Sequence, residues 1–466
     1  MSNTADLLVV GAGPGGMATA LEASRNDASV ILFEVDEVIG GNASRSTGYL
    51  AFQDFDMQSD EDLTDSPEIF FDDMIAEIER QKEKYGIIFD EDLAKIFAKE
   101  SSETYSWLCE LGFEFNRFLP RPLQHSVNRM VDVKDTTMFT TLFETALEES
   151  GVRILTSTRV ERLIMENSQI IGIATSKGEF YANKGVVLAA GGYQANKALR
   201  QRYQPESMAS SPYLGTEHDI GDGHLMGQEV GGDLINMTMI PPLIMVGSAL
   251  VEESIAVNRD GERFHDEAGP YDYRVNELKK QPDQQAWYIF DNQTFKRKSQ
   301  LIHEMPEEPH KAESLNGLAE EVGIDPIHLK KTVNTWNEFL TTDALNDPLF
   351  GRVIFPNPRI GITESPFFAS KMVIGINFPA GGFRVNTDLQ VLNVYGEPIS
   401  HLFAVGDCVG GLGPVIGMGG MRITPALTLG RVVGRNIATD QVSQEQTLEN
   451  ADRIPANKMK IPVVDA

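Results

Sequence analysis

Residues 5–25 read ADLLVVGAGPGGMATALEASR: an apolar run, a glycine-rich turn and a stretch with helical spacing. The next apolar run, SVILFE, ends in the acid Glu34. Strand, glycine turn, helix, strand and acid are the parts of a βαβ unit that binds a dinucleotide. Gly11, Gly13 and Gly16 allow the turn and let a pyrophosphate approach the helix N-terminus. Glu34 can accept hydrogen bonds from a ribose, so the pattern predicts a dinucleotide-binding domain here.

The composition bounds the partners and the compartment. The 466 residues include 68 acids against 40 bases, a formal net charge of −28, and 41% are hydrophobic. This charge repels nucleic acid and anionic lipid, so we expect neither as a partner. Cys109 and Cys408 are the two cysteines and have no metal-site or haem spacing, which favours a reducing cytoplasm and predicts no metal. No apolar run reaches the length of a membrane span, and residues 1–10 lack a basic targeting segment.

Changes in composition divide the chain. Its length suggests two large units or about three ordinary ones. Residues 1–234 carry glycine turns and buried apolar runs, whereas 235–376 are richer in aromatic and charged residues. The glycine-rich pattern returns in 377–442, and 443–466 form a polar tail. The sequence therefore predicts an α/β fold in which a Rossmann-type domain is interrupted by an inserted α+β domain that covers the substrate.

Periodicity within these segments predicts the main elements. Residues 66–112 have the spacing of two helices, and further helices are expected within 311–344 and up to about residue 438. Residues 153–183 are interpreted as a small antiparallel meander of three strands, followed by a separate buried strand at 184–192.

Three segments decide which dinucleotide binds. GGNASRSTG at 40–48 is a further glycine and serine loop, as a longer ligand requires. In LFAVGDC, Asp407 follows an apolar run and a glycine turn, where it could hold a polyol chain. Residues 417–431 open a helix whose N-terminus would face the negative end of a flavin. An NAD site needs none of these, so the sequence predicts FAD, bound non-covalently because the 40–48 loop has no histidine or cysteine. The predicted cofactor contacts are Gly11, Gly13, Pro14, Gly15, Gly16, Glu34, Gly41, Asn42, Ser44, Gly48, Val160, Ala190, Gly191, Asp407, Gly419, Ile423 and Thr424.

Six motifs, in the order in which they occur, resemble the flavoprotein family of fumarate reductases and 3-ketosteroid dehydrogenases. They are GAGPGG with the later Glu34, GGNASRSTG, VVLAAGG, NRDGERFHDE, AGGFRVN, and LFAVGDCVGG with GGMRITPALTLGR. The resemblance covers residues 5 to about 438. It implies a two-domain flavoprotein whose substrate lies between the cap and the isoalloxazine, with two-electron chemistry at a carbon–carbon bond next to a carbonyl.

The fumarate reductase branch of this family grips a dicarboxylate with arginines and histidines. The resemblance puts its acid arginine four residues after Glu267, where this chain has Tyr271. Its second arginine falls on Gly417, and its late histidine falls on Phe378. A doubly charged substrate would then lie unpaired in a dry site, which is costly, so the resemblance argues against fumarate.

The ketosteroid branch fits these positions better. DEAGPY at 266–271 is similar to its pattern NE-x-x-P-Y, whose tyrosine takes the proton next to the ketone. GMGGMRITPALTLG is similar to its late signature, with Gly420 on the glycine whose N–H holds the ketone oxygen. The resemblance thus implies that Tyr271 is the base, which requires a positive charge or hydrogen bonds to lower its pKa. Arg274 is a candidate for that charge, and so is the helix N-terminus beside Gly420.

Departures from this branch leave the substrate open. Its second ketone-binding tyrosine falls on Ile416. The candidates to replace a missing tyrosine are His125, Tyr193, Tyr213 and Tyr273. Arg422, beside the flavin end of the late helix, has three alternatives: a substrate carboxylate, the flavin O2 or a surface position. The expected substrate is a 3-ketosteroid or a smaller cyclic ketone, with or without a carboxylate.

Three interpretations of the function follow. In the first, a desaturase, Tyr271 removes the proton α to a ketone, the Gly420 N–H stabilises the enolate oxygen and the β-hydride passes to FAD N5. The second is a reductase that saturates an enone or enoate with electrons from a donor protein, since the reverse reaction uses the same groups. The third is a redox flavoprotein whose catalytic set has decayed. The first is favoured, with the electron acceptor or donor left unidentified.

Overall fold

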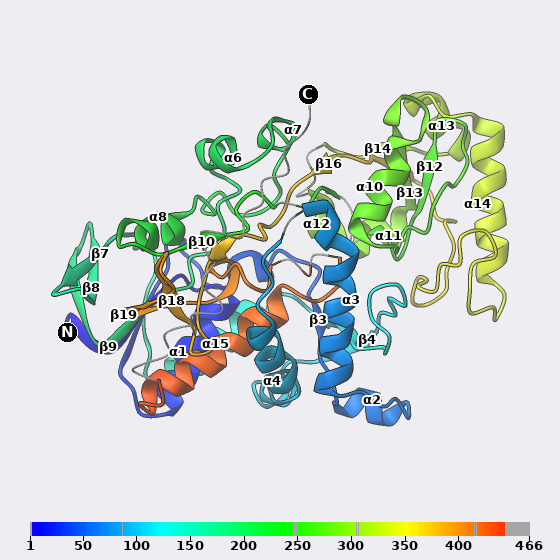
Figure 1. Ribbon diagram of the computed structural model, residues 1–466. Helices are drawn as coiled ribbons and strands as arrows, with labels where there is room; N and C mark the ends of the chain where they lie inside the picture. Colours follow the sequence, from blue (N-terminus) through cyan, green and yellow to red (C-terminus); the bar gives the residue numbers. More distant parts are fainter. Residues whose placement is uncertain are drawn as a thin grey trace.

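The computed structural model describes residues 2–85, 87–239, 241–245, 250–303, 305, 307–413, 415 and 417–442 (Figure 1). Ile416 and the polar tail at 443–466 therefore lie outside the described residues. Helices and strands alternate along much of the chain, as the predicted α/β class requires.

The glycine-rich turn follows β1, an inner strand of an eight-stranded sheet. Its strands follow the order β18-β19-β8-β9-β1-β2-β6, and β7 pairs with β8 off this path. β1 and β2 run parallel and are joined by α1 (Pro14–Arg25), so the predicted βαβ unit is present. The strands are β1 Thr4–Val10, β2 Val30–Phe33, β6 Arg153–Leu155, β7 Val160–Glu166, β8 Gln169–Thr175, β9 Gly178–Leu188, β18 Gln390–Leu392 and β19 Pro398–Ala404.

Helix α15, Ile423–Ala438, lies against α1 (Figure 1). Their backbones approach closely, because a Cβ on Gly430 would lie 2.4 Å from the carbonyl oxygen of Gly15. The start of α1 is equally tight on the end of β1, since a Cβ on Gly16 would lie 1.9 Å from the oxygen of Gly11. Glycine at these positions brings the first turn of α1 beside the late segment of the chain.

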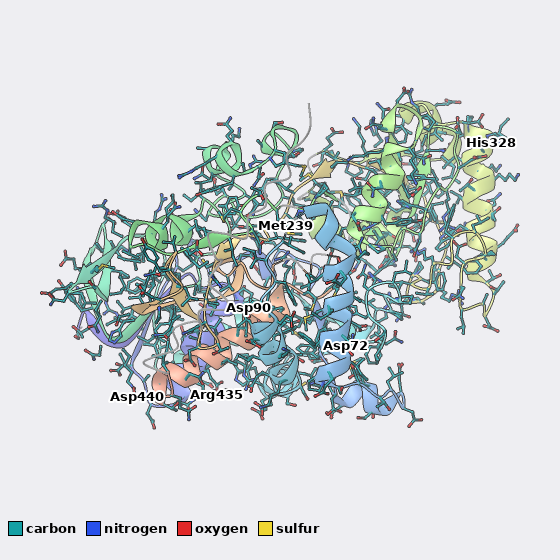
Figure 2. All side chains as sticks on the ribbon, viewed as in Figure 1. Asp72, Asp90, Met239, His328, Arg435 and Asp440 are labelled. Carbon is teal, nitrogen blue, oxygen red and sulfur yellow. The ribbon has the colours of Figure 1, made fainter. Side chains whose placement is uncertain are left out.

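A second sheet lies apart from the first, in the green and yellow region of Figure 1. Its strand order is β12-β13-β15-β14, and all pairs are antiparallel. Trp287 and Ile289 of β13 pack with α13 and α14, while the alternate residues Tyr288 and Phe290 pack with α10, so both faces are buried. Figure 2 shows His328 on the outer side of α14. The elements of this region are β12 Ile255–Asn258, α10 Tyr271–Lys279, η2 Pro282–Gln284, β13 Ala286–Asp291, α11 Asn292–Arg297, α12 Ser299–His303, β14 His310–Ala312, α13 Leu315–Val322, α14 Pro326–Leu340 and β15 Phe367–Lys371.

Smaller sheets join the two regions. They are the three-stranded sheet β3-β5-β4 and the pairs β10-β17 and β11-β16. Their strands are β3 Tyr49–Ala51, β4 Phe115–Phe118, β5 Met130–Val133, β10 Leu234–Ile235, β11 Leu243–Ile244, β16 Ile374–Gly375 and β17 Gly382–Phe383. The remaining helices are η1 Gly41–Ala43, α2 Asp56–Asp60, α3 Pro67–Tyr85, α4 Glu91–Glu110, α5 Met138–Glu149, α6 Lys197–Tyr203, α7 Glu206–Ala209, α8 Asp222–Glu229 and η3 Gly406–Cys408. Within the described part of the chain, no helix has the length and apolar character needed to cross a membrane.

The predicted helices are present as α3, α4, α13, α14 and α15. The predicted meander is wrong in its first strand: β6 pairs in parallel with β2, and only β7, β8 and β9 are antiparallel neighbours in turn. The strand expected at 184–192 is the second half of β9 rather than a separate strand. A short apolar run does not specify its partner, because pairing depends on distant residues. The domain boundaries 1–234, 235–376 and 377–442 stay predictions.

Glu267 lies fully buried between two arginines beside the second sheet. Arg263 donates to both of its oxygens, at 2.8 and 2.7 Å, and Arg352 Nη1 donates to Oε2 at 3.0 Å. The Ala256 N–H of β12 donates to Oε1 at 3.0 Å. Both guanidinium groups lie over the Trp336 ring, 4.8 and 4.7 Å from its centre. Burial alone would raise the pKa of Glu267, but the two arginines outweigh it and lower the pKa to about 2.

Glu267→Gln should lower the free energy of unfolding by about 3–5 kcal/mol, because the buried Arg352 loses its countercharge and Arg263 keeps only Asp347, at 3.1 Å. Since the pKa of Glu267 is depressed in the folded state, this contribution is present above about pH 4.5 and is lost as the pH falls toward about 2. Urea unfolding at neutral and acidic pH measures both effects. Glu114→Gln is the control: its partner Lys134 is more than half exposed, so the loss should stay below ~0.5 kcal/mol. Equal losses in the two variants would contradict the role of the buried group.

Candidate active site

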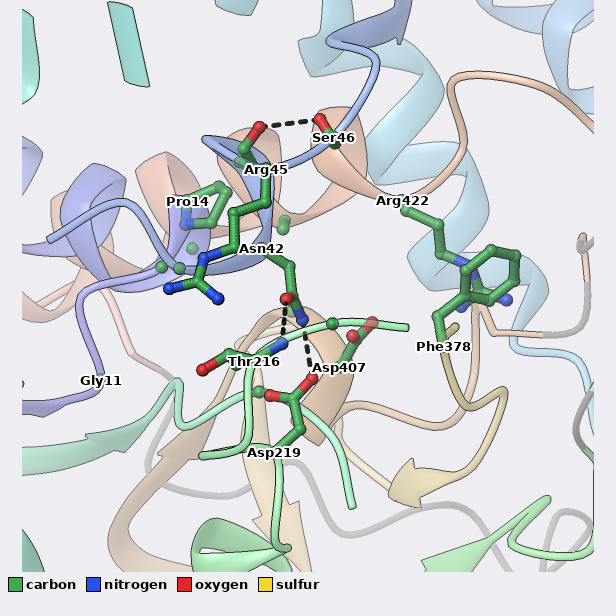
Figure 3. A pocket seen from close by; sticks show the side chains of 18 of the residues that line it. Gly11, Pro14, Asn42, Arg45, Ser46, Thr216, Asp219, Phe378, Asp407 and Arg422 are labelled. Carbon is green, nitrogen blue, oxygen red and sulfur yellow. Dashed lines mark hydrogen bonds between the residues drawn. The ribbon is translucent and has the colours of Figure 1, made fainter. Parts of the chain in front are cut away.

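A cavity of about 350 Å³ lies at the carboxyl ends of β1, β2, β9 and β19 (Figure 3). In α/β folds, nucleotide ligands bind at this edge of the parallel sheet, where the strands end and the loops and helices begin. The wall also includes Met245, Tyr271 and Met305 from the inserted region. Before and within α15 it includes Met418, Gly420, Met421, Arg422, Ile423 and Ala426. The cavity therefore joins the glycine-rich turn to the segment that carries the predicted base.

Most of the predicted cofactor residues line this cavity. They are Gly11, Gly13, Pro14, Gly15, Glu34, Gly41, Asn42, Ser44, Val160, Ala190, Gly191, Asp407 and Ile423. Those that do not line it are Gly16, Gly48, Gly419 and Thr424, which are packed against other protein atoms. Thr424, for example, is fully buried and its hydroxyl accepts the Ala51 N–H at 2.9 Å.

The glycine turn leaves room for a pyrophosphate. A Cβ on Gly13 would meet no protein atom within 4 Å, so this glycine faces open space. Gly13 is also the N-cap of α1, and no side chain caps that helix end. The free N–H groups of a first helical turn and the helix dipole favour an anion at this point. These residues fit the phosphate groups of FAD.

Glu34 is held at the end of β2 by backbone donors. The Ala12 N–H donates to Oε2 at 2.7 Å, and the Asp36 N–H donates to Oε1 at 2.9 Å. Burial raises the pKa of Glu34, and these hydrogen bonds oppose that effect. Because each carboxylate oxygen can accept more than one hydrogen bond, Glu34 can still accept a ribose hydroxyl from the cavity.

No sequence motif marks Asp219, which organises the middle of the cavity. It accepts hydrogen bonds from Asn42 Nδ2 and from the Tyr213 hydroxyl, each at 2.7 Å. Asn42 Oδ1 accepts the Thr216 N–H at 2.9 Å, so the amide of Asn42 is bonded on both sides (Figure 3). Asn42 therefore shapes the wall through other protein groups.

Arg422 lies beside Phe378 in the cavity (Figure 3). Its guanidinium carbon is 4.3 Å from the centre of the Phe378 ring, and Nη2 donates to the oxygen of Gly413 at 2.8 Å. Burial lowers the pKa of Arg422, although Asp407 opposes this. Burial raises the pKa of Asp407 to about 6, with Arg422 opposing in turn. The surface position is therefore wrong for Arg422, and a substrate carboxylate or the flavin O2 remain.

Tyr271 begins α10 and lines the cavity from the side of the second sheet. Its ring meets Phe378 edge-on with the ring centres 6.2 Å apart, and the Arg274 guanidinium lies 5.0 Å from the Tyr271 ring centre. Arg274 is 3% exposed, and its Nε and Nη1 have no hydrogen-bond partner among the described residues. Tyr271, Gly420 and Arg422 thus share the cavity, whereas Arg274 lies behind Tyr271.

The cavity wall does not include the candidates for the missing tyrosine, which are His125, Tyr193, Tyr213 and Tyr273. Tyr49 does line it, and its hydroxyl donates to Glu252. The pairing of β3 with β5 positions Tyr49 at the cavity wall. This contact joins distant parts of the chain, so no local sequence pattern predicts it.

A family model described as FAD binding domain matches residues 6–423. The chain belongs to this family. A probable fumarate reductase of Shewanella frigidimarina is 30% identical, and the match covers 94% of this chain and 75% of that protein. A urocanate reductase of Eggerthella lenta is 28% identical with the same coverage.

Solved structures agree with this assignment. The open conformation of a flavocytochrome c3 fumarate reductase matches with a TM-score of 0.71 and 29% identity, covering 94% of this chain and 79% of that chain. A 3-ketosteroid delta1-dehydrogenase from Sterolibacterium denitrificans shares the fold, with a TM-score of 0.68 and 19% identity over 94% of this chain and 100% of that chain. The protein is an FAD-dependent oxidoreductase of the fumarate reductase family that acts on carbon–carbon bonds, and the predicted cofactor and fold class are confirmed.

Gly13→Val should abolish FAD binding without unfolding the protein. The added side chain would enter the open space that a pyrophosphate needs, and its Cβ would meet no protein atom within 4 Å. Flavin absorbance of the purified protein and its thermal unfolding measure the two effects. Gly317→Ala on α13 is the control, since its Cβ would make an ordinary contact 3.4 Å from Ser314. Stoichiometric FAD in Gly13→Val would contradict this placement of the cofactor.

Proposed function

We propose that this enzyme desaturates a cyclic ketone at the α,β carbon–carbon bond, with Tyr271 as the base. The observation that carries the proposal is the environment of Tyr271. Its ring lines the cavity, and the buried guanidinium of Arg274 lies behind it, without a carboxylate partner in the described structure. A guanidinium over the face of a tyrosine ring holds that ring in place through a cation–π contact. Tyr271 can then accept the proton α to the ketone.

The remaining groups of the cavity stabilise the carbonyl oxygen of the substrate, accept the hydride and exclude water. The Gly420 N–H meets the negative charge that develops on the carbonyl oxygen, because a fixed backbone donor stabilises an oxyanion. Bound FAD supplies the acceptor for the hydride that leaves the β carbon, and an external electron acceptor completes the turnover. The apolar side chains of Met245, Met305 and Phe378 line the cavity and would keep water from the reacting carbons.

Arg422 extends the proposal to the class of ketone. Its guanidinium lies over Phe378, and Phe378 also touches Tyr271, so a ring that reaches the base also reaches this cation. A ketone that carries one carboxylate would pair with Arg422. A smaller cyclic ketone with one carboxylate therefore suits the cavity better than a neutral steroid.

A second candidate is the reverse reaction, the reduction of an enone or enoate. Relatives at 30% and 28% identity carry the names probable fumarate reductase and urocanate reductase. In that direction protonated Tyr271 donates the proton. Without oxygen, bleaching of the yellow protein by a saturated ketone supports the first candidate. Recovery of the colour of dithionite-reduced protein by an enone or enoate, with no bleaching by ketones, supports the second.

Three more assignments belong to the proposal. Residues 235–376 form the substrate cap, which the separate second sheet and the presence of Tyr271 beside it support. FAD is held non-covalently, since the 40–48 loop offers no histidine or cysteine. The enzyme acts in the cytoplasm, in keeping with Cys109 and Cys408 as free thiols.

Tyr271→Phe should lower kcat by ~10²–10⁴-fold, the usual contribution of a general base. FAD content should not change, because Tyr271 is not part of the glycine turn. Tyr273→Phe on the same helix is the control, since Tyr273 does not line the cavity. Normal turnover of Tyr271→Phe on a ketone that bleaches the wild type would rule out Tyr271 as the base.

Arg422→Ala should raise KM for a carboxylated cyclic ketone by about tenfold or more, because a charge-assisted hydrogen bond is lost. For the matched methyl ester, which has no charge, KM should change little. Steady-state kinetics with the two substrates measure the difference. Equal effects on both would assign Arg422 to the cofactor rather than to the substrate.

A further inference from the structure

His125 lies outside the cavity, yet it holds a residue next to the cavity wall. Its Nε2 is 2.9 Å from the carbonyl oxygen of Gly419. The neighbouring Gln124 accepts the Gly419 N–H on Oε1 at 2.8 Å. The C=O and the N–H of Gly419 are therefore hydrogen-bonded to two consecutive side chains, His125 and Gln124. The next residue, Gly420, lines the cavity.

Arg129 fixes the tautomer of His125. Its Nη1 lies 3.4 Å from His125 Nδ1, and a guanidinium can only donate. Nδ1 is therefore the lone-pair nitrogen, and the proton on Nε2 donates to Gly419. Arg129 is itself fully buried, with Nε and Nη2 donating to the two Asp65 oxygens at 2.9 and 2.7 Å and Nη1 donating to Asp73. Burial, with help from Arg129, lowers the pKa of His125 to about 4, so the ring is neutral at ordinary pH.

The peptide bond between Gly419 and Gly420 transmits this contact to the cavity. In a planar trans peptide the C=O and the N–H point in opposite directions. Because the Gly419 oxygen points at His125, the Gly420 N–H points to the opposite side, and no described residue accepts a hydrogen bond from it. Gly420 has φ +79°, and a Cβ there would lie 2.7 Å from Ala51 N, so this conformation requires glycine.

We infer that His125 is a positioning residue which, with Arg129 and Asp65, aims the Gly420 N–H at the carbonyl oxygen of the substrate. Donation from the imidazole to the Gly419 oxygen also polarises the peptide group, which makes the Gly420 N–H a stronger donor. The inference rests on the proposed function, because it assigns this N–H to the oxyanion of that reaction. It predicts that the cavity binds any flat molecule with an anionic oxygen more tightly than its neutral ether.

The test compares the binding of 4-nitrophenolate and 4-nitroanisole to the FAD-loaded protein by calorimetry. His125→Leu should raise the Kd of 4-nitrophenolate by about tenfold or more, since a hydrogen bond to a charged group weakens, and should leave the Kd of 4-nitroanisole unchanged. His125→Gln, whose Nε2 can still donate to Gly419, should restore most of the affinity. Equal losses for both ligands, or no preference for the phenolate in the wild type, would overturn the inference.

Phe70→Leu controls for simple loosening. Phe70 packs on His125 and on Arg129, so this variant should lower the melting temperature but keep the preference for the phenolate. A second measurement needs no active-site change: nitrogen NMR of histidine-labelled wild type should show His125, assigned with His125→Gln, as the Nε2–H tautomer at neutral pH. A proton on Nδ1 would refute the inference.

Binding of the phenolate needs no turnover, so this result is separate from the identity of the base. Loss of phenolate preference in His125→Leu with normal turnover in Tyr271→Phe would refute the proposed base and keep the role of His125. Unchanged preference in His125→Leu with loss of turnover in Tyr271→Phe would do the reverse.

Discussion

The carboxylate of Glu267 lies between Arg263 and Arg352 inside the inserted region, and the position of Tyr271 depends on it. One of its oxygens also accepts the Ala256 N–H, which ties the segment to β12. From Glu267 the chain passes through Pro270 into the first turn of α10, which begins at Tyr271. Removing a carboxylate from water costs several kcal/mol unless all its partners are present. These contacts therefore fix the chain four residues before Tyr271, at the point where it enters α10.

A second buried ion pair, between Arg129 and Asp65, supports the part of the cavity wall at Gly420. Arg129 and Asp65 are fully buried, and through His125 they fix the backbone next to Gly420. Apolar cores tolerate swaps of similar volume at a cost below about 1.5 kcal/mol, so packing alone places an atom loosely. A hydrogen bond from a charged group has a preferred length and direction, and in a dry interior it is costly to break. The two groups that the proposed reaction needs are thus held by directional contacts, while the apolar wall between them can vary with the substrate.

How far the sequence predicts this site depends on how local each signal is. The turn from Gly11 to Gly16 and the acid Glu34 are readable because each acts within one βαβ unit. Tyr271 was predicted because DEAGPY at 266–271 resembles a motif that lies within six residues, and its role as the base stays a prediction. Asp219 and Tyr49 were not, since Asp219 reaches the cofactor loop through Asn42, 177 residues away, and Tyr49 contacts Glu252, 203 residues away.

For His125 and β6, the sequence predicts that a residue or strand is present but does not predict which part of the chain it contacts. The sequence offers His125 as a replacement for a missing tyrosine, but its partner Gly419 is 294 residues distant, and this contact turns the ring away from the substrate. β6 is three residues long, too short for its pattern to choose between the meander and the edge of the main sheet. In both cases the sequence shows which residues are present, but the residues that they contact are determined by the tertiary structure.

The charges on the cavity wall limit the substrate further. Arg45 lies near Pro14 and Asn42, at the nucleotide end, while Arg422 lies beside Phe378 on the other side of the cavity (Figure 3). The described wall also contains Arg159, and Arg422 is the arginine that packs on Phe378, whose ring meets the Tyr271 ring. A dicarboxylate placed there would leave one of its charges without a partner, and an unpaired anion in a dry cavity is strongly disfavoured. The comparisons show the fumarate reductase family and the flavin cofactor, and the charge of the wall supports the singly charged ketone of the proposed function.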